Sequence, residues 1–375
     1  MSHRHCFATP REFMYQDYSI IGYHGHILYV LSYEGDAGGP TEVIIWSVHT
    51  MVPKSWKKLK TFVVDGPPEV LIPALTSNGD LIYLLCVYFS PDTHLGVCQI
   101  LKFHTETLET STYLLDQSEE NREQFETVEI SDVGIVCGES DAFLVDRNVT
   151  RGMYKYTKLI CDDVTKTFRV QHTWIPPCDE GRRFPIHFDP DNRQIVRYTE
   201  GANFLVFNNS TNQWDTYEPS ETSDPDAAQH QGYGIRVTYG PLRERCTAIS
   251  SSFNMFGRSG MCFAAAYNSC QRTDTFFSFT LDEEAKTFTF TRVGTYLRPK
   301  TVFQFRLASN GVYIVRLGRK FVEFLRTDVP SLREIGFWRV QEIFSKKDVE
   351  QNWHGGKTEE EIKRALNIKS AMNLV

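Results

Sequence analysis

The chain has 375 residues, of which 41% are hydrophobic and 23% are charged, and its formal net charge is −7. This balance is that of a globular protein: it excludes wholesale disorder, and it provides no basic excess that would attract nucleic acid or anionic membranes. The longest purely apolar run covers residues 81–89, whereas about 20 apolar residues are needed to span a bilayer, so we expect no transmembrane helix.

The first residues lack the apolar core of a signal peptide. The nine cysteines are an odd number, and no two of them form a Cys-x-x-Cys pair. We therefore expect an intracellular protein of the cytoplasm, with the nucleus left open, whose cysteines are free thiols. No metal and no cofactor is expected, because the sequence contains no phosphate-binding loop, dinucleotide fingerprint or zinc-protease motif.

Most of the chain predicts β-strands, because its apolar runs are short, rich in β-branched and aromatic residues, and bounded by turn residues. In chain order, the runs lie at 27–33, 42–48, 81–89, 97–103, 154–161, 168–174, 194–198, 203–207, 275–281, 288–293, 311–317 and 321–325. Residues 1–14 are expected to be a flexible N-terminus. Helical periodicity is missing until about residue 330.

One local pattern recurs among these strands: a strand ends, a polar turn follows, and an aromatic residue opens the next strand. It is clearest at residues 162–168, 208–214 and 282–288, and weaker copies end at Trp56 and Thr110. The first residue of such a turn can bond to its own backbone, and the aromatic residue can pack between sheets. The copies recur at intervals close to the roughly 40–50 residues of a four-stranded propeller blade.

This repeat resembles that of kelch propellers over residues 15–327, although the kelch double glycine occurs only once in that range, at Gly38 and Gly39. The resemblance implies an all-β, kelch-like β-propeller that binds a protein substrate, and the repeat count predicts six blades. A β-sandwich or barrel with coincidentally similar turns is the alternative fold.

Three segments exceed the length of a blade and are interpreted as loop insertions, at 116–125, 218–232 and 254–274. Loops carry the specificity of such scaffolds, so we expect the substrate there. Candidate residues are acidic ones for a basic substrate and arginines for an acidic ligand: Glu119, Glu120, Glu123, Arg182, Arg183 and Arg243. The alternative is that all six are ordinary solvated charges.

The pattern changes at Pro330, where a helical tail is predicted for residues 328–375. Ser331 and Glu334 form a capping box, in which each side chain serves the other residue's amide. A second capping box opens another predicted helix at Thr358. Apolar or small residues follow the first cap at helical spacing, so they form one stripe, which comprises Leu332, Ile335, Gly336, Val340 and Ile343.

Ser331, Leu332, Gly336 and Val340 resemble the BC box that opens SOCS-box and von Hippel–Lindau-box tails. Steps of four residues drift only about 40° around a helix, so the leucine, the small residue and the valine face one partner. The resemblance implies that the tail binds elongin C of the elongin B/C adaptor, on which a cullin–RING ubiquitin ligase assembles. The residues expected at this contact are Ser331, Leu332, Ile335, Gly336, Val340 and Ile343.

Two features depart from that family. Gly336 stands where the family usually has cysteine, and the tail contains no proline of a cullin box. The identity of the cullin is therefore left open.

The sequence thus predicts a non-catalytic substrate-recognition subunit of an elongin BC–cullin–RING E3 ubiquitin ligase. Its propeller loops would bind target proteins for ubiquitination and proteasomal degradation, with no direct nucleic-acid or membrane partner. One alternative is a propeller scaffold without a ligase, whose tail packs as a helical hairpin under the propeller floor. Another is a propeller enzyme with titratable residues in the central channel, for which the sequence contains no motif.

Overall fold

A computed structural model describes most of the first 327 residues. The described residues are 4–34, 40–50, 52, 55–66, 68–89, 96–119, 121, 133–148, 153–174, 186–189, 194–198, 204–208, 211, 213–224, 235–237, 253–258, 261–268, 272–298, 305–310 and 312–327. The chain divides into two units, residues 1–327 and 328–375. The predicted helical tail lies outside the described residues.

The first unit is mostly β-strand. Its strands form consecutive meanders, in which each strand pairs antiparallel with the next along the chain. The first meander contains β2 (Asp17–His24), β3 (Ile27–Glu34), β4 (Thr41–His49) and β5 (Lys57–Val64). The second contains β6 (Pro68–Leu75), β7 (Leu81–Phe89), β8 (Gly96–His104) and β9 (Thr110–Leu115). The third contains β10 (Val133–Cys137), β11 (Ala142–Asn148), β12 (Met153–Asp162) and β13 (Thr167–Trp174).

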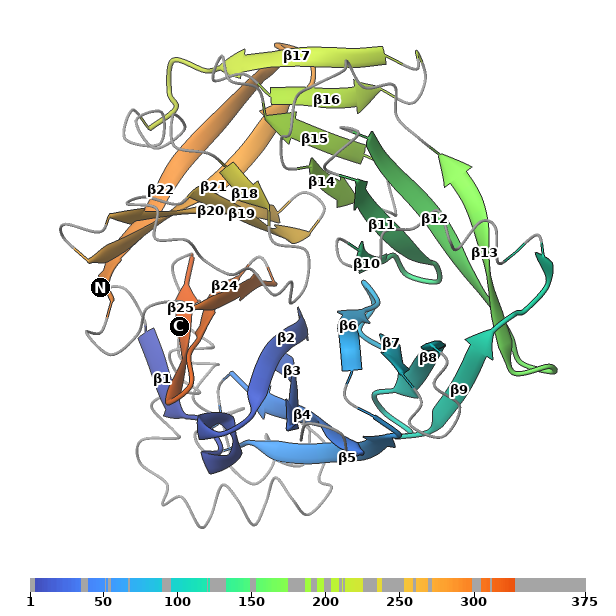
Figure 1. The fold of residues 1–375 in the computed structure, drawn as a ribbon. Coiled ribbons are helices and arrows are strands. Elements are labelled where there is room, and N and C mark those ends of the chain that lie inside the picture. The colour runs from blue at the N-terminus through green and yellow to red at the C-terminus, as the bar shows by residue number, and fades with distance from the viewer. Residues whose placement is uncertain are drawn as a thin grey trace, which may run out of the picture. The chain divides into compact units, whose positions relative to one another are not determined.

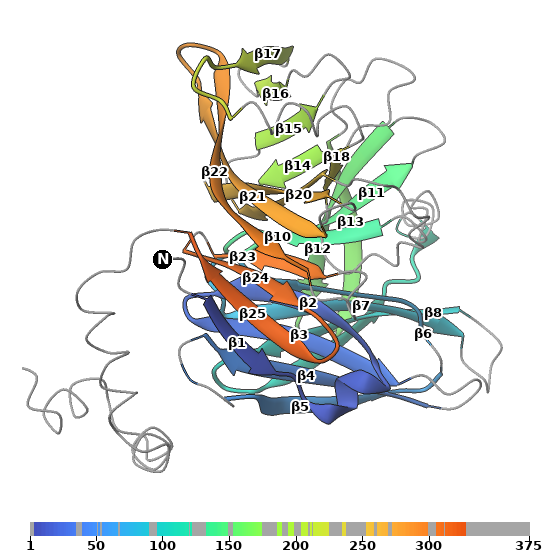
Figure 2. The ribbon, with the colours of Figure 1, turned by 90° about the vertical axis from the view of Figure 1, so that its left-hand side faces the viewer.

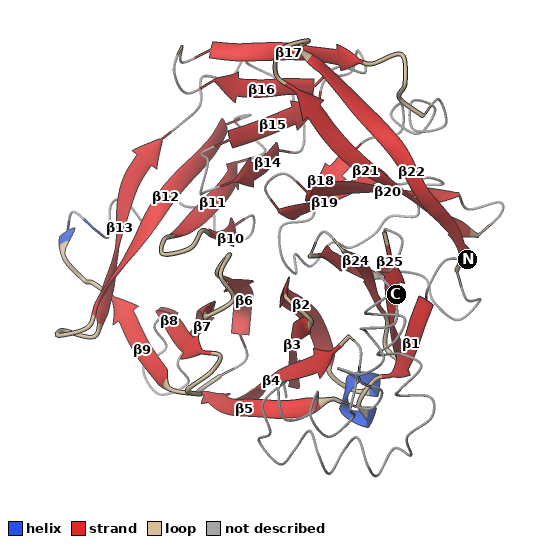
Figure 3. Cartoon of the chain, turned by 180° about the vertical axis from the view of Figure 1, so that it is seen from behind, coloured by secondary structure: helices blue, strands red, loops and turns tan. Residues whose placement is uncertain are grey.

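The remaining strands form one further antiparallel meander, a group whose first two strands pair in parallel, and a last sheet that includes the N-terminal strand. The fourth meander contains β14 (Ile186–Asp189), β15 (Gln194–Tyr198), β16 (Phe204–Asn208) and β17 (Gln213–Pro219). The next group contains β18 (Ile235–Val237), β19 (Phe253–Arg258), β20 (Met261–Asn268), β21 (Thr273–Asp282) and β22 (Thr287–Leu297). The last sheet contains β23 (Arg306–Ser309), β24 (Tyr313–Leu317), β25 (Phe321–Arg326) and the N-terminal β1 (Arg4–Ala8). Figure 3 shows how strands dominate, with the short 3-10 helix η1 (Arg11–Met14) beside them.

The first strand of each meander lies toward a common centre, so the fold of this unit is propeller-like (Figure 1). β2 contacts both β6 and β23, and β6 contacts β10. β19 in turn contacts β14 and β23. Successive sheets therefore pack face to face around the centre, as in a propeller, rather than as the two layers of a sandwich.

β7 illustrates why a propeller needs such apolar strands. Its alternate residues Ile82 and Leu84 pack in a cluster with the first meander, while Tyr83 and Leu85 pack in a cluster with the third. Side chains of a strand point alternately to the two faces of its sheet, so a strand that is covered on both faces is apolar throughout. This explains the continuous apolar run that the sequence carries at Leu81–Phe89.

The N-terminal segment differs from the prediction. β1 pairs antiparallel with β25, from Arg4 opposite Leu325 to Ala8 opposite Phe321, and Figure 2 shows the two strands side by side. Phe13 of η1 is fully buried. The expectation of a flexible N-terminus is therefore corrected for residues 4–14, since a strand from the start of the chain completes the last sheet.

The predicted loop insertion at residues 254–274 is also corrected. Most of it forms β19 and β20, which pair antiparallel from Phe253 opposite Ala266 to Arg258 opposite Met261. The glycine, serine and alanine residues of this segment suggested a loop. Strand formation depends more on pairing with neighbours than on the propensity of single residues, and here β21 supplies the neighbour.

Candidate functional site

The outer strands of two pairs of neighbouring sheets are joined, and we call these joins the β9–β13 seam and the β17–β22 seam. In the first, β9 and β13 pair in parallel. The amide of Leu114 donates to the Lys166 carbonyl at 3.0 Å, and the amide of Asp116 donates to the Phe168 carbonyl at 2.8 Å. The predicted acidic insertion therefore leaves β9 from a fixed starting point.

Asn121, which is only 5% exposed, fixes the first residues of that insertion at a second point. Its side-chain amide donates to the Asp116 carbonyl at 2.7 Å, and its side-chain oxygen accepts the Val170 amide at 2.8 Å. The carboxylate of Asp116 accepts the Ser118 amide at 3.1 Å. Between these bonds, Glu119 is exposed to solvent.

The β17–β22 seam repeats this arrangement with different residues. The amide of Ser220 donates to the Phe288 carbonyl at 2.8 Å, and the amide of Asp224 donates to the Phe290 carbonyl at 2.8 Å. The hydroxyl of Ser223 accepts the Phe290 amide at 3.2 Å, so Ser223 takes the part that Asn121 takes in the other seam. The start of the second acidic insertion is thus fixed as well.

The negative charges at the start of the second acidic insertion are partly neutralised. Asp224 forms an ion pair with Arg292, with a distance of 3.0 Å between its Oδ2 and the Arg292 Nε. Glu218 and Glu221 are exposed. Exposed carboxylates on anchored segments attract basic groups without any rearrangement of the protein.

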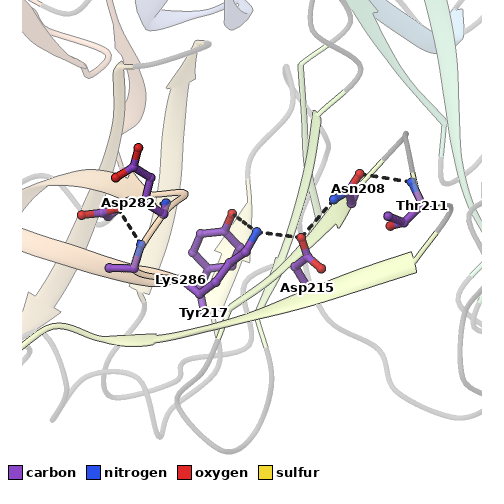
Figure 4. Close-up of polar contacts among 8 residues, drawn as sticks. Asn208, Thr211, Asp215, Tyr217, Asp282 and Lys286 are labelled. Carbon is purple, nitrogen blue, oxygen red and sulfur yellow. Dashed lines mark hydrogen bonds and ion pairs between the residues drawn. The ribbon is translucent and has the colours of Figure 1, made fainter.

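At the opposite end of the β17–β22 seam, a lysine joins the two sheets (Figure 4). Lys286 Nζ lies 2.8 Å from Asp215 Oδ2 and 3.4 Å from the Tyr217 hydroxyl. The same nitrogen lies 5.1 Å from the centroid of the Tyr217 ring. Asn208 also donates to Asp215, at 3.2 Å. The hydrogen bond from Lys286, followed by that from Asn208, lowers the pKa of Asp215, and Asp215 in turn raises the pKa of Lys286.

Lys166 has the same position in the β9–β13 seam. Its Nζ lies 5.2 Å from the centroid of the Tyr113 ring and 3.5 Å from Asp163. Lys166 and Lys286 both have a positive φ, at 54° and 52°. That conformation is costly for a residue with a side chain and closes the turn before each seam aromatic.

Both turns confirm the prediction that the first residue of the repeated turn bonds to the turn's own backbone. Asp162 Oδ1 accepts the Val164 amide at 2.8 Å. Asp282 Oδ1 accepts the Ala285 amide at 2.9 Å. The aromatic residues that end these turns, Phe168 and Phe288, are fully buried.

The tight hairpins at the inner ends of several sheets bond to one another. Asn310 donates to the Gly25 carbonyl at 2.5 Å, and His24 Nδ1 lies 3.1 Å from the Ser77 carbonyl. The Ser77 amide donates to the Gly138 carbonyl at 3.1 Å. These hydrogen bonds tie neighbouring hairpins together.

The most deeply buried charges are also structural. Arg316 is fully buried, with its Nε 2.9 Å from Glu323 Oε2 and its Nη1 3.5 Å from Asp274. Its guanidinium lies 4.3 Å from the centroid of the Phe305 ring. These contacts tie β21 to β24 and β25 within the core.

Of the six candidate substrate-binding residues, the structure describes Glu119, which is exposed at the start of the first insertion. The other five lie outside the described residues, as do the six predicted elongin C contacts. These are Glu120, Glu123, Arg182, Arg183 and Arg243, and Ser331, Leu332, Ile335, Gly336, Val340 and Ile343. Asn121 and Ser223 were missed by the sequence analysis, since no spacing distinguishes them from neighbouring polar residues.

The described part of the chain contains no group of three or more side chains that could hold a metal ion. Among the same residues, no helix is long and apolar enough to cross a membrane. The chain matches no model of a known protein family and no curated protein.

Proposed function

We propose that this protein is the substrate-recognition subunit of an elongin BC–cullin–RING E3 ubiquitin ligase. In this proposal, the propeller-like unit binds a target protein and the C-terminal tail binds elongin C. The protein itself performs no chemistry. It holds the target beside the ubiquitin-loaded enzyme, which raises the effective concentration of the target's lysines there.

The proposed propeller has six blades. Four blades are the meanders β2–β5, β6–β9, β10–β13 and β14–β17, and the fifth is β18–β22. The sixth combines β23, β24 and β25 with β1. Pairing between the first and last strands of the domain closes the ring in this arrangement, because it ties both ends of the domain into one blade.

The target site is proposed on the connections that leave β9 and β17. The anchoring of residues 116–119, 121 and 218–224 supports this, because a fixed segment loses less conformational entropy on binding than a free one. The exposed carboxylates of Glu119, Glu218 and Glu221 favour a basic target segment.

The observation that carries the ligase assignment is the division of the chain after Thr327, just before the sequence that resembles a BC box. In the proposed contact, Leu332 fills an apolar pocket of elongin C. Gly336 lets the partner's backbone approach closely, and Val340 extends the contact by another turn. Ser331 caps the helix, while Ile335 and Ile343 border the stripe.

A binding measurement with purified full-length chain and elongin B/C complex tests this proposal. Leu332→Ala should abolish co-elution and leave the melting temperature nearly unchanged. Phe337→Ala is the matched control, because it truncates an apolar residue of the same predicted helix outside the BC-box positions, and it should retain binding. If Leu332→Ala keeps binding elongin and lowers the melting temperature strongly, the tail packs on its own chain and the ligase assignment is wrong.

A further inference from the structure

β5 is the outer strand of its sheet, and its outer edge differs from those of β13 and β22. In the two seams, the carbonyls of Phe168 and Phe288 accept amides from the segment that follows β9 or β17. Among the residues that the structure describes, β5 pairs only with β4. Within the described part of the chain, no segment bonds to its outward main-chain donors and acceptors along Lys57–Val64.

The sequence explains why the described segment that follows β1 does not fill this edge. The segment that leaves β1 reaches Pro10, which has no amide hydrogen to donate, and turns into η1. Contact with the neighbouring sheet is made by side chains instead. Trp56 Nε1 donates to the Ala8 carbonyl at 2.9 Å, and the ring of Phe13 packs against Trp56 with 5.3 Å between centroids.

The positive charge along β5 indicates which kind of partner its outer edge would bind. Lys57 and Lys58 are exposed and Lys60 is half-buried. Across residues 4–327, as far as they are described, none of the three forms an ion pair with an acidic side chain. Lysines on an edge strand repel a second copy of the same edge, so self-association there is disfavoured. They attract an extended segment that carries carboxylates.

The other end of the strand is apolar. Val63 is 61% exposed and follows the half-buried Phe62. A strand docked beside β5 would therefore meet positive charge at the lysine end and an apolar side chain near Val63. This polarity distinguishes one direction of the docked segment from the other.

We propose that the outer edge of β5 is a docking site for an extended, acidic segment of a partner protein. The segment adds a strand parallel to β5, as β9 does on β13, with its acidic residues beside Lys57 to Lys60 and an apolar residue beside Val63. Main-chain hydrogen bonds supply the affinity, and the lysines supply charge selection and salt dependence. This site does not depend on the tail or on elongin C.

The test uses the full chain and a fluorescent peptide of about ten residues, a length that matches one strand, whose first half is acidic and whose second half alternates valine and threonine. Anisotropy should report saturable binding that weakens with salt. The peptide with its halves exchanged should bind more weakly, because its carboxylates then lie near Val63. No saturable binding up to about 1 mM peptide would overturn the proposal.

Matched variants locate the site. Lys57→Glu should weaken binding at least about fivefold, since it places a carboxylate beside the acidic half. Arg169→Glu is the control. Like Lys57, Arg169 is exposed and directly follows an aromatic residue, but it lies on β13, whose outer edge is already paired with β9. Equal losses for the two variants would mean that the peptide senses only overall charge, and the proposed site would be wrong.

N-methylation of the peptide separates strand addition from simple attraction of charges. Methyl groups on alternate amides should abolish binding in one of the two alternations and leave the other nearly unchanged, because only every second amide of a docked strand faces β5. Binding that tolerates both alternations would contradict a docked strand. Both protein variants should keep the melting temperature of the unaltered chain.

Discussion

The two strand-joined seams and the contact between β1 and Trp56 solve one packing problem in two ways. In the β9–β13 and β17–β22 seams, an aspartate-capped turn and a lysine lead into a buried phenylalanine, whose carbonyl accepts a main-chain amide. At the third contact the turn is held by Ser55, whose hydroxyl bonds both the amide and the carbonyl of His49. Trp56 replaces the phenylalanine, and its indole replaces the main-chain bond.

This difference shows which part of the repeat the packing requires. An aromatic residue after the turn is common to all three places, whereas the polar partners and the strand pairing change. The third contact lies where the start of the chain joins the last sheet through β1 and β25. Because Trp56 bonds to β1 through its side chain, β1 does not pair with β5 and forms its strand pairing with β25.

The largest expected effect comes from the aromatic core of a joined seam. Phe288 is fully buried, and its ring centroid lies 4.7 Å from that of Phe204 and 5.6 Å from that of Phe290. Phe288→Ala should lower the free energy of unfolding by about 3–5 kcal/mol, through lost burial and the cavity left behind. Urea denaturation measures this, with Phe62→Ala at a half-buried position as the milder control. A loss below about 1 kcal/mol would mean that the seam is not part of the cooperative core.

The turn at the third contact should make stability depend on pH through His49. Burial, followed by the nearby His26, lowers the pKa of His49 to about 4. A histidine in the unfolded chain titrates near 6.5. The unfolded state therefore binds more protons between these values, so the contribution of His49 is complete above about pH 6.5 and is lost as the pH falls toward 4.

His49→Gln should remove this dependence. The unaltered chain should lose on the order of 2 kcal/mol more than the variant between pH 6.5 and pH 4. Denaturation at several pH values provides the measurement. Parallel stability curves for the two proteins would show that His49 titrates as it does in the unfolded chain.

A smaller effect should isolate the indole bond of the third contact. Trp56→Phe keeps an aromatic ring and removes the donor to the Ala8 carbonyl, so it should cost about 1 kcal/mol. The midpoint of urea unfolding should shift with an unchanged slope. If the variant is as stable as the unaltered chain, packing of the ring alone holds this contact.

The smallest effect concerns the turn conformation of the joined seams. Lys286→Ala loses the bond to Asp215 and keeps a side chain at positive φ, whereas Lys286→Gly loses the bond and relieves the backbone strain. The glycine variant should therefore melt at a higher temperature than the alanine variant. The reverse order, measured by calorimetry, would mean that the backbone at this turn is not strained.

The sequence predicted the repeat better than its exceptions. The turns ending at Phe168 and Phe288 carry local signals, because an aspartate bonds amides within the same turn, and these signals were sufficient. β1 carries none, since its pairing with β25 joins residues from opposite ends of the domain. β19 and β20 were taken for a loop, because small residues form strands only where neighbours supply the pairing.

In the candidate site, too, local features could be predicted from the sequence and contacts between distant residues could not. Acidic insertions were recognised from their composition, and Glu119 lies exposed in the first of them. Their anchoring by Asn121 and Ser223 could not be predicted, because each bonds a residue of the next sheet that is far away in the sequence.

The proposed ligase role is tested most directly by affinity purification of the full chain from cells, followed by mass spectrometry. Elongins B and C should co-purify with the unaltered chain and be lost from the Leu332→Ala variant. Recovery of the same proteins from both, or of no elongin from either, would contradict the account.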